Sequence, residues 1–433
     1  MTVVAPHQLI LFGPPGTSKS YTAKHVKVKD LEAQLVPVAF HPEFSYGEFV
    51  ARLLPMSVDG KIHYKVHAGP FLRALALAYA DGERNVVLLI DEINRGNCAE
   101  IFGDTFQLLD RDDDGRSCYE IVVSELTIGA LRQELDALGH DNGKWSAPLK
   151  QLMAARQLKL PANLYLIGTM NTSDESIYFM DSAFKRRWNF EFLSCGFDDV
   201  PAEQRDARLF GPHSMYTLKQ FVDALNRFIV ENCSAPKLDD KLVGPWFIKA
   251  QKAPLDCSAD LAQLKEMAPQ VAIYNYGADH SRKFEQALLA FAAKMGGAMQ
   301  QKVHDLAGYQ PSQGPSVLKK IAADPVSHYY KSKSRKNFEP SSDGPVLIED
   351  FVIALESCIA EQQLAPRIAK GDVVGKLFLY LWDNVFDRDK TPLCKRLNLE
   401  RNAMRTFGQF VAHADDFIAR LCNPPPDTAA AKG

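Results

Sequence analysis

The chain has 433 residues, of which 46% are hydrophobic and 24% are charged, and its net charge is −3. A chain of this length is expected to hold two or three domains, and its apolar content is ample for their cores. The near-neutral charge gives no sign that the whole molecule is drawn to nucleic acid or to a membrane surface, so any such contact would have to be local.

The eight cysteines are scattered singly, with no C-x-x-C pair. This spacing argues against a zinc site or a disulfide framework and favours reduced thiols in a cytosol. The N-terminus runs directly into the apolar segment QLILF, residues 8–12, so we expect no signal peptide. No apolar run of about 18 residues is present, and a membrane span is not expected. The sequence therefore predicts a cytoplasmic protein.

Strand and helix patterns alternate along the first part of the chain. In chain order we expect a strand at 8–12, a helix at 19–35, a strand at 35–41, a helix at 69–80, a strand at 85–92, an edge hairpin at 115–126, a helical insertion at about 127–160, a strand at 163–171, and a helix turning into a strand over 181–192. NVVLLIDE and NLYLIGTMN contain long apolar runs, which are typical of parallel strands buried on both faces. This alternation predicts a three-layer α/β domain over about 1–195.

Beyond residue 196 the periodicity becomes helical, as in 217–232 and 281–295. We divide this half of the chain into a first helical part at 196–250, an unplaced and mostly helical insertion at 251–370 with a flexible loop at 309–346, a second helical part at 371–422, and a tail at 423–433. The tail, NPPPDTAAAKG, is expected to be disordered.

The segment GPPGTSKS, residues 13–20, is close to the phosphate-binding pattern G-x-x-x-x-G-K-[ST]. A strand leads into it and a helix follows, so backbone N–H groups at the helix N-terminus would face phosphates. Lys19 is expected at the β- and γ-phosphates, and the Ser20 hydroxyl on Mg²⁺. Ser18 stands where glycine is usual and would weaken nucleotide binding unless the backbone keeps its usual dihedral angles. The candidate nucleotide-binding residues of this segment are Gly13, Pro14, Pro15, Gly16, Thr17, Ser18, Lys19, Ser20 and Tyr21.

Two acidic residues, Asp91 and Glu92, end the apolar run at 85–92. At the end of such a strand, an aspartate can hold the Mg²⁺ shell and a glutamate can polarise the water that attacks a γ-phosphate. Alone, two adjacent acids after a strand are more often a solvated turn. Their place downstream of a phosphate-binding loop favours Asp91 as a metal ligand and Glu92 as a catalytic residue.

Three further residues are catalytic candidates because of this ordered context. Asn171 ends the strand at 163–171, where its amide could orient the attacking water, although in isolation it would be a turn cap. Arg186 and Arg187, in DSAFKRRW, could be cations donated to the nucleotide of a neighbouring subunit. The plainer alternative for the arginines is that they balance the C-terminal end of a helix.

These motifs and their order resemble the McrB-type AAA+ motor subunits of the dynein-related/MoxR-like branch, from modification-dependent restriction systems. The most specific strings are DEINRGN and GTMNTSD with the following RRW, and the resemblance covers about residues 8–195. A fainter likeness to the helical lid of that family continues at 225–247 and 376–393. Within it, VGPWF at 243–247 stands where the family usually has IGHSYF, and 250–370 matches nothing that we can place.

The resemblance implies an α/β AAA+ P-loop domain with a parallel sheet, followed by a helical lid and a mostly α-helical C-terminal region. It also implies a Mg²⁺-dependent NTPase that assembles as a homo-oligomer, a hexamer, with sites shared between subunits. The roles that it assigns by position are Walker B for Asp91 and Glu92, sensor 1 for Asn171, support of the nucleotide site for Asn94, and the cation supplied in trans for Arg186, Arg187 or Arg95.

The leading hypothesis is an ATPase or GTPase motor of a McrBC-like restriction or phage-defence complex, acting on DNA through a partner nuclease of the McrC type. The P-loop begins almost at Met1 and no nuclease motif stands out, so target recognition is expected in 250–370 or in a partner, and cutting in a partner. HYYKSKSRKNF, at 328–338, is a candidate for direct DNA contact, with a solvated loop as the plainer interpretation.

Two other functions stay open from the sequence. One is a MoxR-like ATPase that remodels proteins, and the other is a nucleotide-gated binding protein with little turnover, which Ser18 would favour. No motif distinguishes adenine from guanine, and ATP is placed ahead of GTP only because it is commoner among AAA+ proteins.

Overall fold

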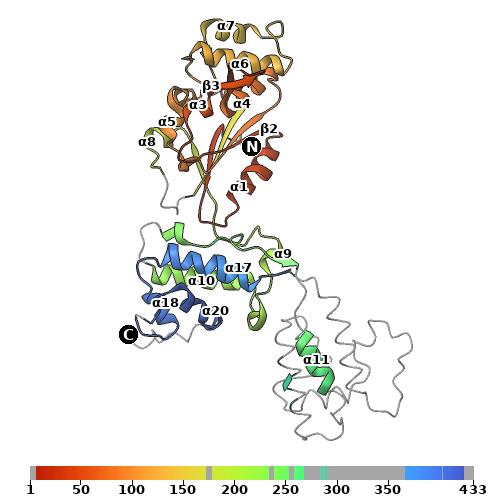
Figure 1. The fold of residues 1–433 in the computed structure, drawn as a ribbon, viewed down its shortest axis with the longest axis vertical. Coiled ribbons are helices and arrows are strands. Elements are labelled where there is room, and N and C mark those ends of the chain that lie inside the picture. Colours follow the sequence, from red (N-terminus) through yellow and green to blue (C-terminus); the bar gives the residue numbers. More distant parts are fainter. Residues whose placement is uncertain are drawn as a thin grey trace, which may run out of the picture. The chain divides into compact units, whose positions relative to one another are not determined.

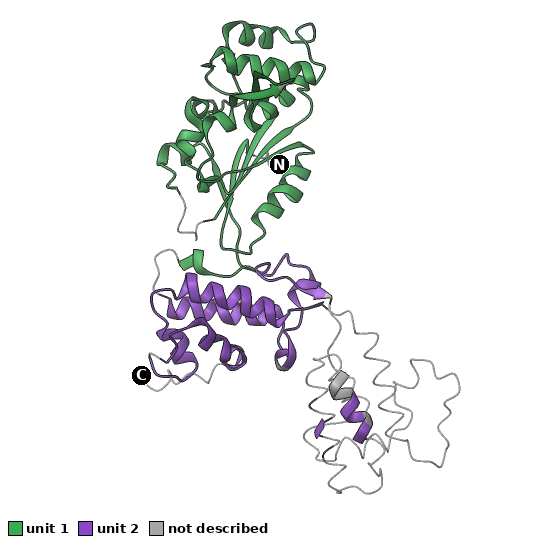
Figure 2. Cartoon of the chain, viewed as in Figure 1, with its two compact units in different colours: residues 1–195, 237–244 green, residues 196–236, 245–433 purple. Residues whose placement is uncertain are grey.

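The computed structural model describes residues 6–171, 178–233, 238–252, 258–267, 366–401 and 403–423, with single residues at 283, 286, 287 and 290. The expected loop at 309–346, the basic stretch at 328–338, most of the expected helix at 281–295 and all but the first residue of the tail lie outside the described residues. The chain divides into two compact units, 1–195 with 237–244 and 196–236 with 245–433 (Figure 2).

The first unit alternates strands with helices from its start. Its elements are β1 (Gln8–Phe12), α1 (Lys19–Thr22), a π-helical turn (Ala23–Lys27), α2 (Val28–Asp30), β2 (Gln34–Ala39), α3 (Tyr46–Phe49), β3 (Ala51–Val58), β4 (Lys61–Ala68), α4 (Pro70–Ala80), β5 (Val86–Asp91), a 3₁₀ turn (Ile93–Arg95), α5 (Cys98–Phe102), a 3₁₀ segment (Gly103–Leu109), β6 (Ile121–Val122), α6 (Glu125–Ala137), α7 (Ala147–Ala155), β7 (Gln157–Leu158), β8 (Leu164–Met170), α8 (Ser182–Lys185), β9 (Asn189–Phe192) and a 3₁₀ turn (Leu238–Lys241).

Figure 1 shows the central sheet of this unit with helices around it. The sheet has five parallel strands, in the order β2-β5-β8-β1-β9. Parallel neighbours need crossover connections, and the helices between the strands supply them. The order makes β5, β8 and β1 adjacent, so the residues that follow these three strands meet at one edge of the sheet. The predicted α/β three-layer fold with a parallel sheet is confirmed.

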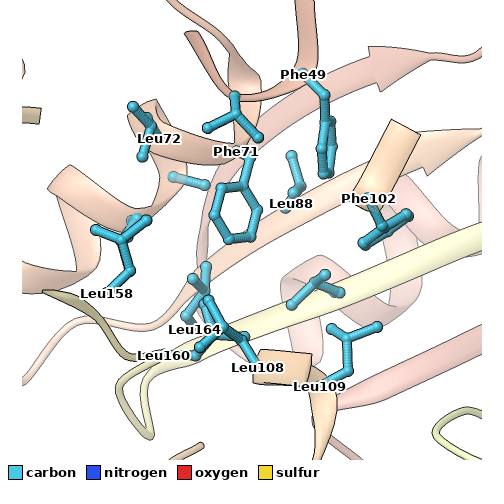
Figure 3. Packing of buried hydrophobic residues seen from close by; sticks show 14 of the residues in the cluster. Phe49, Phe71, Leu72, Leu88, Phe102, Leu108, Leu109, Leu158, Leu160 and Leu164 are labelled. Atoms are coloured by element: carbon cyan, nitrogen blue, oxygen red, sulfur yellow. The ribbon is translucent and has the colours of Figure 1, made fainter. Parts of the chain in front are cut away.

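The central strands are apolar on both faces because packed side chains cover both sides of the sheet. On β1, Ile10 enters the larger hydrophobic cluster, whereas Leu9 and Leu11 enter a second cluster with the helical segment that follows the glycine loop. In the larger cluster, Phe71 of α4 packs near Leu88 of β5 (Figure 3), and both are fully buried. Each such buried side chain contributes about 1.5–3 kcal/mol, which fixes the strands that carry the site.

Two element boundaries differ from the predicted ones for local reasons. The helix expected at 19–35 ends at Asp30, and Glu32 just beyond it has a left-handed φ of 49°. The edge hairpin expected at 115–126 is wrong: its only strand, β6, pairs with β7, outside the main sheet. The same stretch already begins α6, because the Ser124 side chain caps that helix by accepting the Thr127 N–H.

An antiparallel hairpin, β3–β4, was not expected at all. Its strands pair without a bulge from Ala51 opposite Ala68 to Val58 opposite Lys61. The turn residues Asp59 and Gly60 have φ of 51° and 73°, the positive values of the favoured two-residue hairpin turn. The Asp-Gly pair was the signal in the sequence that could have found it.

The second unit is mostly helical, as predicted for the C-terminal region. Its elements are α9 (Ala202–Arg205), a 3₁₀ turn (Gly211–His213), α10 (Leu218–Asn232), β10 (Gln251–Lys252), α11 (Ser258–Met267), β11 (Pro366–Arg367), α17 (Lys370–Asp372), π-helical segments (Val373–Phe378 and Leu381–Val385), α18 (Thr391–Arg396), α19 (Phe407–Ala412) and α20 (Ala414–Cys422). Phe228 of α10 and Phe417 of α20 pack edge to face at 5.7 Å, and Phe378 and Phe410 join them in one aromatic core.

In the part of the chain that the structure describes, no helix has the length and apolarity needed to cross a bilayer. The six cysteines found there are free thiols, and none of its His, Cys, Asp and Glu side chains form a group of three able to hold a metal. A magnesium ion beside phosphates does not need such a group, because it takes only one or two carboxylates and completes its shell with phosphate oxygens and water.

Candidate functional site

The glycine loop between β1 and α1 has the backbone of a phosphate-binding turn. A Cβ atom at Gly13 would lie 2.4 Å from the Leu193 carbonyl oxygen, so the first position admits only glycine. Gly16 has a φ of 81°, and the Thr17 hydroxyl donates to the Pro14 carbonyl at 2.9 Å across the turn. The loop therefore opens directly onto the first turn of α1, where free N–H groups favour an anion.

Ser18 keeps the loop conformation despite its side chain. Its backbone is left-handed, with φ 62° and ψ 27°, a region that glycine reaches freely. For a non-glycine residue this conformation costs about 1–2 kcal/mol. The serine therefore adds strain to the loop without changing its path.

Lys19 is the first residue of α1, and its side chain folds back over the loop. Only 8% of the residue is exposed, and its ammonium donates to the carbonyls of Gly13 and Pro14, each at 2.9 Å. Phosphate oxygens, which carry charge, are stronger acceptors than these carbonyls. The ammonium thus lies where a phosphate seated in the loop would meet it.

Asp91, at the end of β5, is joined by hydroxyl groups to helix α1 and to the neighbouring strand β8. The Ser20 hydroxyl donates to Asp91 Oδ1 at 2.7 Å, and the Thr169 hydroxyl of β8 donates to the same oxygen. Thr169 also accepts the Glu92 N–H at 3.2 Å, so it links both acidic residues to β8. Ser20 and Asp91 form the hard oxygen pair that Mg²⁺ prefers, so this donor set fits the ion.

Glu92 is held from two sides. Its backbone is left-handed, with a φ of 54°, and its Oε1 accepts the Asn171 side-chain amide at 2.7 Å. Arg95 Nε lies 3.3 Å from Glu92 Oε2. The Asn94 side chain donates to the Asn171 carbonyl at 2.6 Å, which fixes the end of β8 against the turn after β5. The structure therefore brings Glu92, Asn94 and Asn171 together.

The two asparagines in this group carry unsatisfied acceptors. Asn94 Oδ1 and Asn171 Oδ1 are buried, and neither has a hydrogen-bond partner among the described residues. A buried polar atom without a partner costs free energy, so each oxygen is suited to a donor from outside the chain, such as water. Asn171 also donates its side-chain amide to Glu92. A water molecule that donates to Asn171 Oδ1 would therefore lie close to the Glu92 carboxylate.

The adjacent arginines Arg186 and Arg187 have different surroundings. Arg187 makes a bidentate pair with Asp110, with Nε at 2.9 Å and Nη2 at 2.7 Å from the two carboxylate oxygens. Its guanidinium lies 4.0 Å from the Phe106 ring centroid, and only 10% of its side chain is exposed. Arg186 is exposed, and its side chain has no hydrogen bond or ion pair within the described chain. Neither arginine contacts the glycine loop of its own chain in the described residues.

Tyr21 does not reach the loop. The residue is 64% exposed, and its ring lies tilted against that of His25, one helical turn later, with the ring centroids 4.5 Å apart. The structure therefore does not bring Tyr21 together with the other residues of the loop that are candidates for nucleotide binding.

A segment distant in the sequence closes on the glycine loop. Gly244 donates its N–H to the Pro15 carbonyl at 2.9 Å. A Cβ atom at Gly244 would lie 2.4 Å from the Gly16 carbonyl carbon and 2.7 Å from the Thr17 nitrogen. The stretch 237–244 thus belongs to the first unit and supports the loop from outside. No local pattern in the sequence indicates this contact.

Cys195 lies at the end of the first unit's main segment, near the same support. Burial above all, and also the negative charge of Asp239, raise the pKa of its thiol to about 12, against the opposing positive charge of Lys19. The thiol is therefore protonated near neutral pH and is not a nucleophile in this site.

We expect Gly244→Ala to destabilise the loop, because the added methyl group must displace backbone atoms of Gly16 and Thr17. Overpacking of this kind costs about 1–3 kcal/mol, and part of the cost should appear as weaker nucleotide binding. Thermal unfolding and titration with a fluorescent nucleotide would measure both effects. The matched control is Gly82→Ala, because a Cβ at Gly82 has no neighbour within 4 Å. Equal behaviour of the two variants would contradict the supporting role of Gly244.

Comparison with known proteins shows which family the chain resembles. The family model described as "AAA domain (dynein-related subfamily)" matches residues 8–188. The chain is 31% identical over 271 residues to the Type II restriction enzyme BsuMI component YdiS of Bacillus subtilis (strain 168), which covers 56% of this chain and 73% of that protein. It is 29% identical over 196 residues to the Type IV methyl-directed restriction enzyme EcoKMcrB subunit of Escherichia coli (strain K12), covering 44% of this chain and 36% of that protein.

Among solved structures, PCH-2 of C. elegans aligns over 68% of this chain and 62% of its own, with 13% identity and a TM-score of 0.19. A score of that size carries no inference about function. The chain thus spans about a third of the E. coli relative and nearly three quarters of the B. subtilis relative.

Proposed function

Because this chain belongs to the McrB-type group of dynein-related AAA+ proteins, we propose that it is the Mg²⁺-dependent NTPase motor of a restriction or phage-defence complex. The observation that carries the proposal is the convergence of three groups at one edge of the sheet. Lys19 lies in the turn and helix after β1, Asp91 ends β5 with Glu92 directly after it, and Asn171 follows β8. Hydrogen bonds join the carboxylates to the helix after the loop and to β8.

In the proposed reaction, the glycine loop seats the triphosphate and the Lys19 ammonium exchanges its loop carbonyls for β- and γ-phosphate oxygens. Ser20 and Asp91 would hold Mg²⁺, which when bound offsets the charge of the phosphate oxygens. Glu92 takes the proton of the attacking water, and Asn171 orients that water through its side-chain amide. The contacts of Glu92 with Asn171 and Arg95 keep the carboxylate in one orientation before the substrate binds.

We assign the cation supplied in trans to Arg186. Arg187 is committed to Asp110 within its own chain, and Arg95 lies against Glu92, whereas the side chain of Arg186 is exposed. An arginine that must reach a neighbouring nucleotide has to project from its own surface. Arg187 is then a positioning residue, which holds the segment that presents Arg186.

Mixing experiments test this assignment. Arg186→Ala should lower hydrolysis about 10³-fold or more with nucleotide affinity kept. Mixed with Lys19→Ala, which lacks a site but keeps its arginine, it should regain activity, because some interfaces then combine both intact halves. Arg187→Ala should instead lower stability by about 2 kcal/mol, since Asp110 loses its partner. No recovery on mixing, with mixed assembly verified, would contradict the assignment.

The assembly and the partners are part of the same proposal. The names of the two relatives describe components of restriction enzymes, which supports a partner nuclease of the McrC type and DNA as the target. We further propose a homo-oligomeric ring, a hexamer, with ATP preferred over GTP, in the cytoplasm. Residues 196–250, apart from the stretch 237–244 that belongs to the first unit, would form the helical lid together with 371–422.

The test is hydrolysis of ATP and of GTP by the purified chain, with and without DNA and with the product of the neighbouring gene. Turnover stimulated by DNA, together with co-purification of a nuclease, is the expected result. Turnover stimulated by a folded protein instead of DNA would favour a MoxR-like remodelling ATPase. Nucleotide binding without turnover would leave a nucleotide-gated binding protein.

A further inference from the structure

The β3–β4 hairpin separates its side chains sharply by charge. In an antiparallel pair, opposite residues share a face and successive residues alternate between faces. The pairing register therefore places Leu53, Pro55, Ile62, Tyr64 and Val66 on one face. It places Arg52, Lys61, His63, Lys65 and His67 on the other, together with the uncharged Leu54 and Met56 of β3. We call the five basic residues the basic face.

The uncharged face points towards the core of the first unit at the base of the hairpin. Val66 packs against the main hydrophobic cluster, which includes Ala51 and Ala68 of the same face. Towards the turn, this face emerges from the core, and Ile62 and Tyr64 are 72% and 69% exposed. The basic face consequently points away from the core of its own unit.

The positive charge of the basic face is not balanced locally. Lys61, His63 and Lys65 are exposed, and in the described structure their side chains make no hydrogen bond or ion pair. Within the hairpin the only acidic residue is Asp59, at the turn, while Arg52 pairs with Glu48 of α3 at 2.9 Å. An ordinary protein surface intersperses both signs, and this chain has a net charge of −3.

The basic side chains of β4 also form a straight row. They occupy alternate positions from Lys61 to His67, and strand geometry spaces such positions about 6.6 Å apart. The cations of this row are Lys61 and Lys65. Two cations spaced along a strand suit a linear polyanion better than a single small anion. Duplex DNA carries one charge for about every 1.7 Å of its axis, and its major groove admits a two-stranded β-ribbon.

We propose that the basic face of the β3–β4 hairpin binds the phosphate backbone of duplex DNA without sequence preference. The inference rests on the proposed function, in which DNA is the target, and adds a surface on the motor chain itself. Backbone contact by lysine and arginine supplies position and affinity but no base readout. The hairpin would therefore hold DNA of any sequence, while recognition of a target belongs elsewhere.

The experiment is a titration of a fluorescently labelled duplex of mixed sequence with the full chain, read by anisotropy at several salt concentrations. Lys61→Glu with Lys65→Glu should lower the affinity at least about tenfold, and the slope of log affinity against log salt should flatten by about 2. The milder pair Lys61→Gln with Lys65→Gln should act in the same direction, with unchanged thermal unfolding.

Two control pairs separate the basic face from its alternatives. Arg84→Glu with Lys150→Glu makes the same change of charge at exposed positions outside the hairpin and should alter the affinity less than twofold. Ile62→Ser with Tyr64→Ser changes the opposite face and should also leave DNA binding intact. Equal losses in both charge-reversed pairs, a loss confined to the Ile62/Tyr64 pair, or no DNA binding by the unaltered chain would each overturn the proposal.

Hydrolysis without DNA, measured in the same variants, distinguishes this inference from the proposed function. Normal basal turnover with lost DNA affinity supports the hairpin surface. Absence of turnover in the unaltered chain would contradict the NTPase proposal, whatever the DNA titration shows.

Discussion

Lys19→Ala is expected to lower nucleotide affinity about 100-fold. The variant removes the ammonium that lies over the loop, and a hydrogen bond to a charged group contributes about 1.5–3 kcal/mol. A loss near the upper end is expected because Lys19 is only 8% exposed, so water cannot replace it fully at the phosphates. Titration with fluorescent ATP and GTP analogues in the presence of Mg²⁺ measures the effect.

The matched control for this variant is Lys24→Ala. Lys24 lies one helical turn after Ser20, is exposed, and has no hydrogen bond or ion pair of its side chain in the described structure. Its removal makes the same change of net charge and should alter affinity less than twofold. If both variants bind like the unaltered chain, the glycine loop is not the nucleotide site.

Much of the site could be predicted because its residues follow successive parallel strands. The glycine loop, the paired acids and Asn171 each end an apolar run, and parallel strands bring such ends to one edge. The role of Thr169 was not predicted. The signal in the sequence was a hydroxyl group within the apolar run that becomes β8, and in the structure this residue is only 2% exposed. A buried polar residue needs a partner, and Asp91 and Glu92 supply it.

Other features depend on contacts that no local pattern records. Arg186 and Arg187 are adjacent and chemically identical, and only the position of Asp110, 77 residues from Arg187, tells them apart. Gly244 meets the glycine loop from a separate segment of the chain, and its need for a small residue arises from Gly16 and Thr17. Such requirements come from tertiary packing, which sequence periodicity does not contain.

Glu92→Gln should lower the rate of hydrolysis without lowering nucleotide affinity, whereas Lys19→Ala should lower the affinity itself. Glutamine keeps the shape of the side chain and an oxygen that can accept the Asn171 amide, which lies 2.7 Å from Glu92 Oε1. It removes the negative charge and the ability to take a proton. We therefore expect nucleotide affinity within about twofold of the unaltered chain and kcat lower by about 10²–10⁴, the usual contribution of a general base.

Two measurements test this expectation: the rate of hydrolysis in a single turnover, and the identity of the nucleotide that stays bound to the protein. The glutamine variant should release mainly intact triphosphate, whereas the unaltered chain should release diphosphate. Glu100→Gln, at an exposed position of α5, is the control for loss of one acidic charge near the site and should keep the unaltered rate. A normal rate in Glu92→Gln would exclude Glu92 as the base. Glu92 lies between Asn171 and Arg95. If Glu92 is not the base, the water must be activated by a group that does not lie at the ends of β5 and β8.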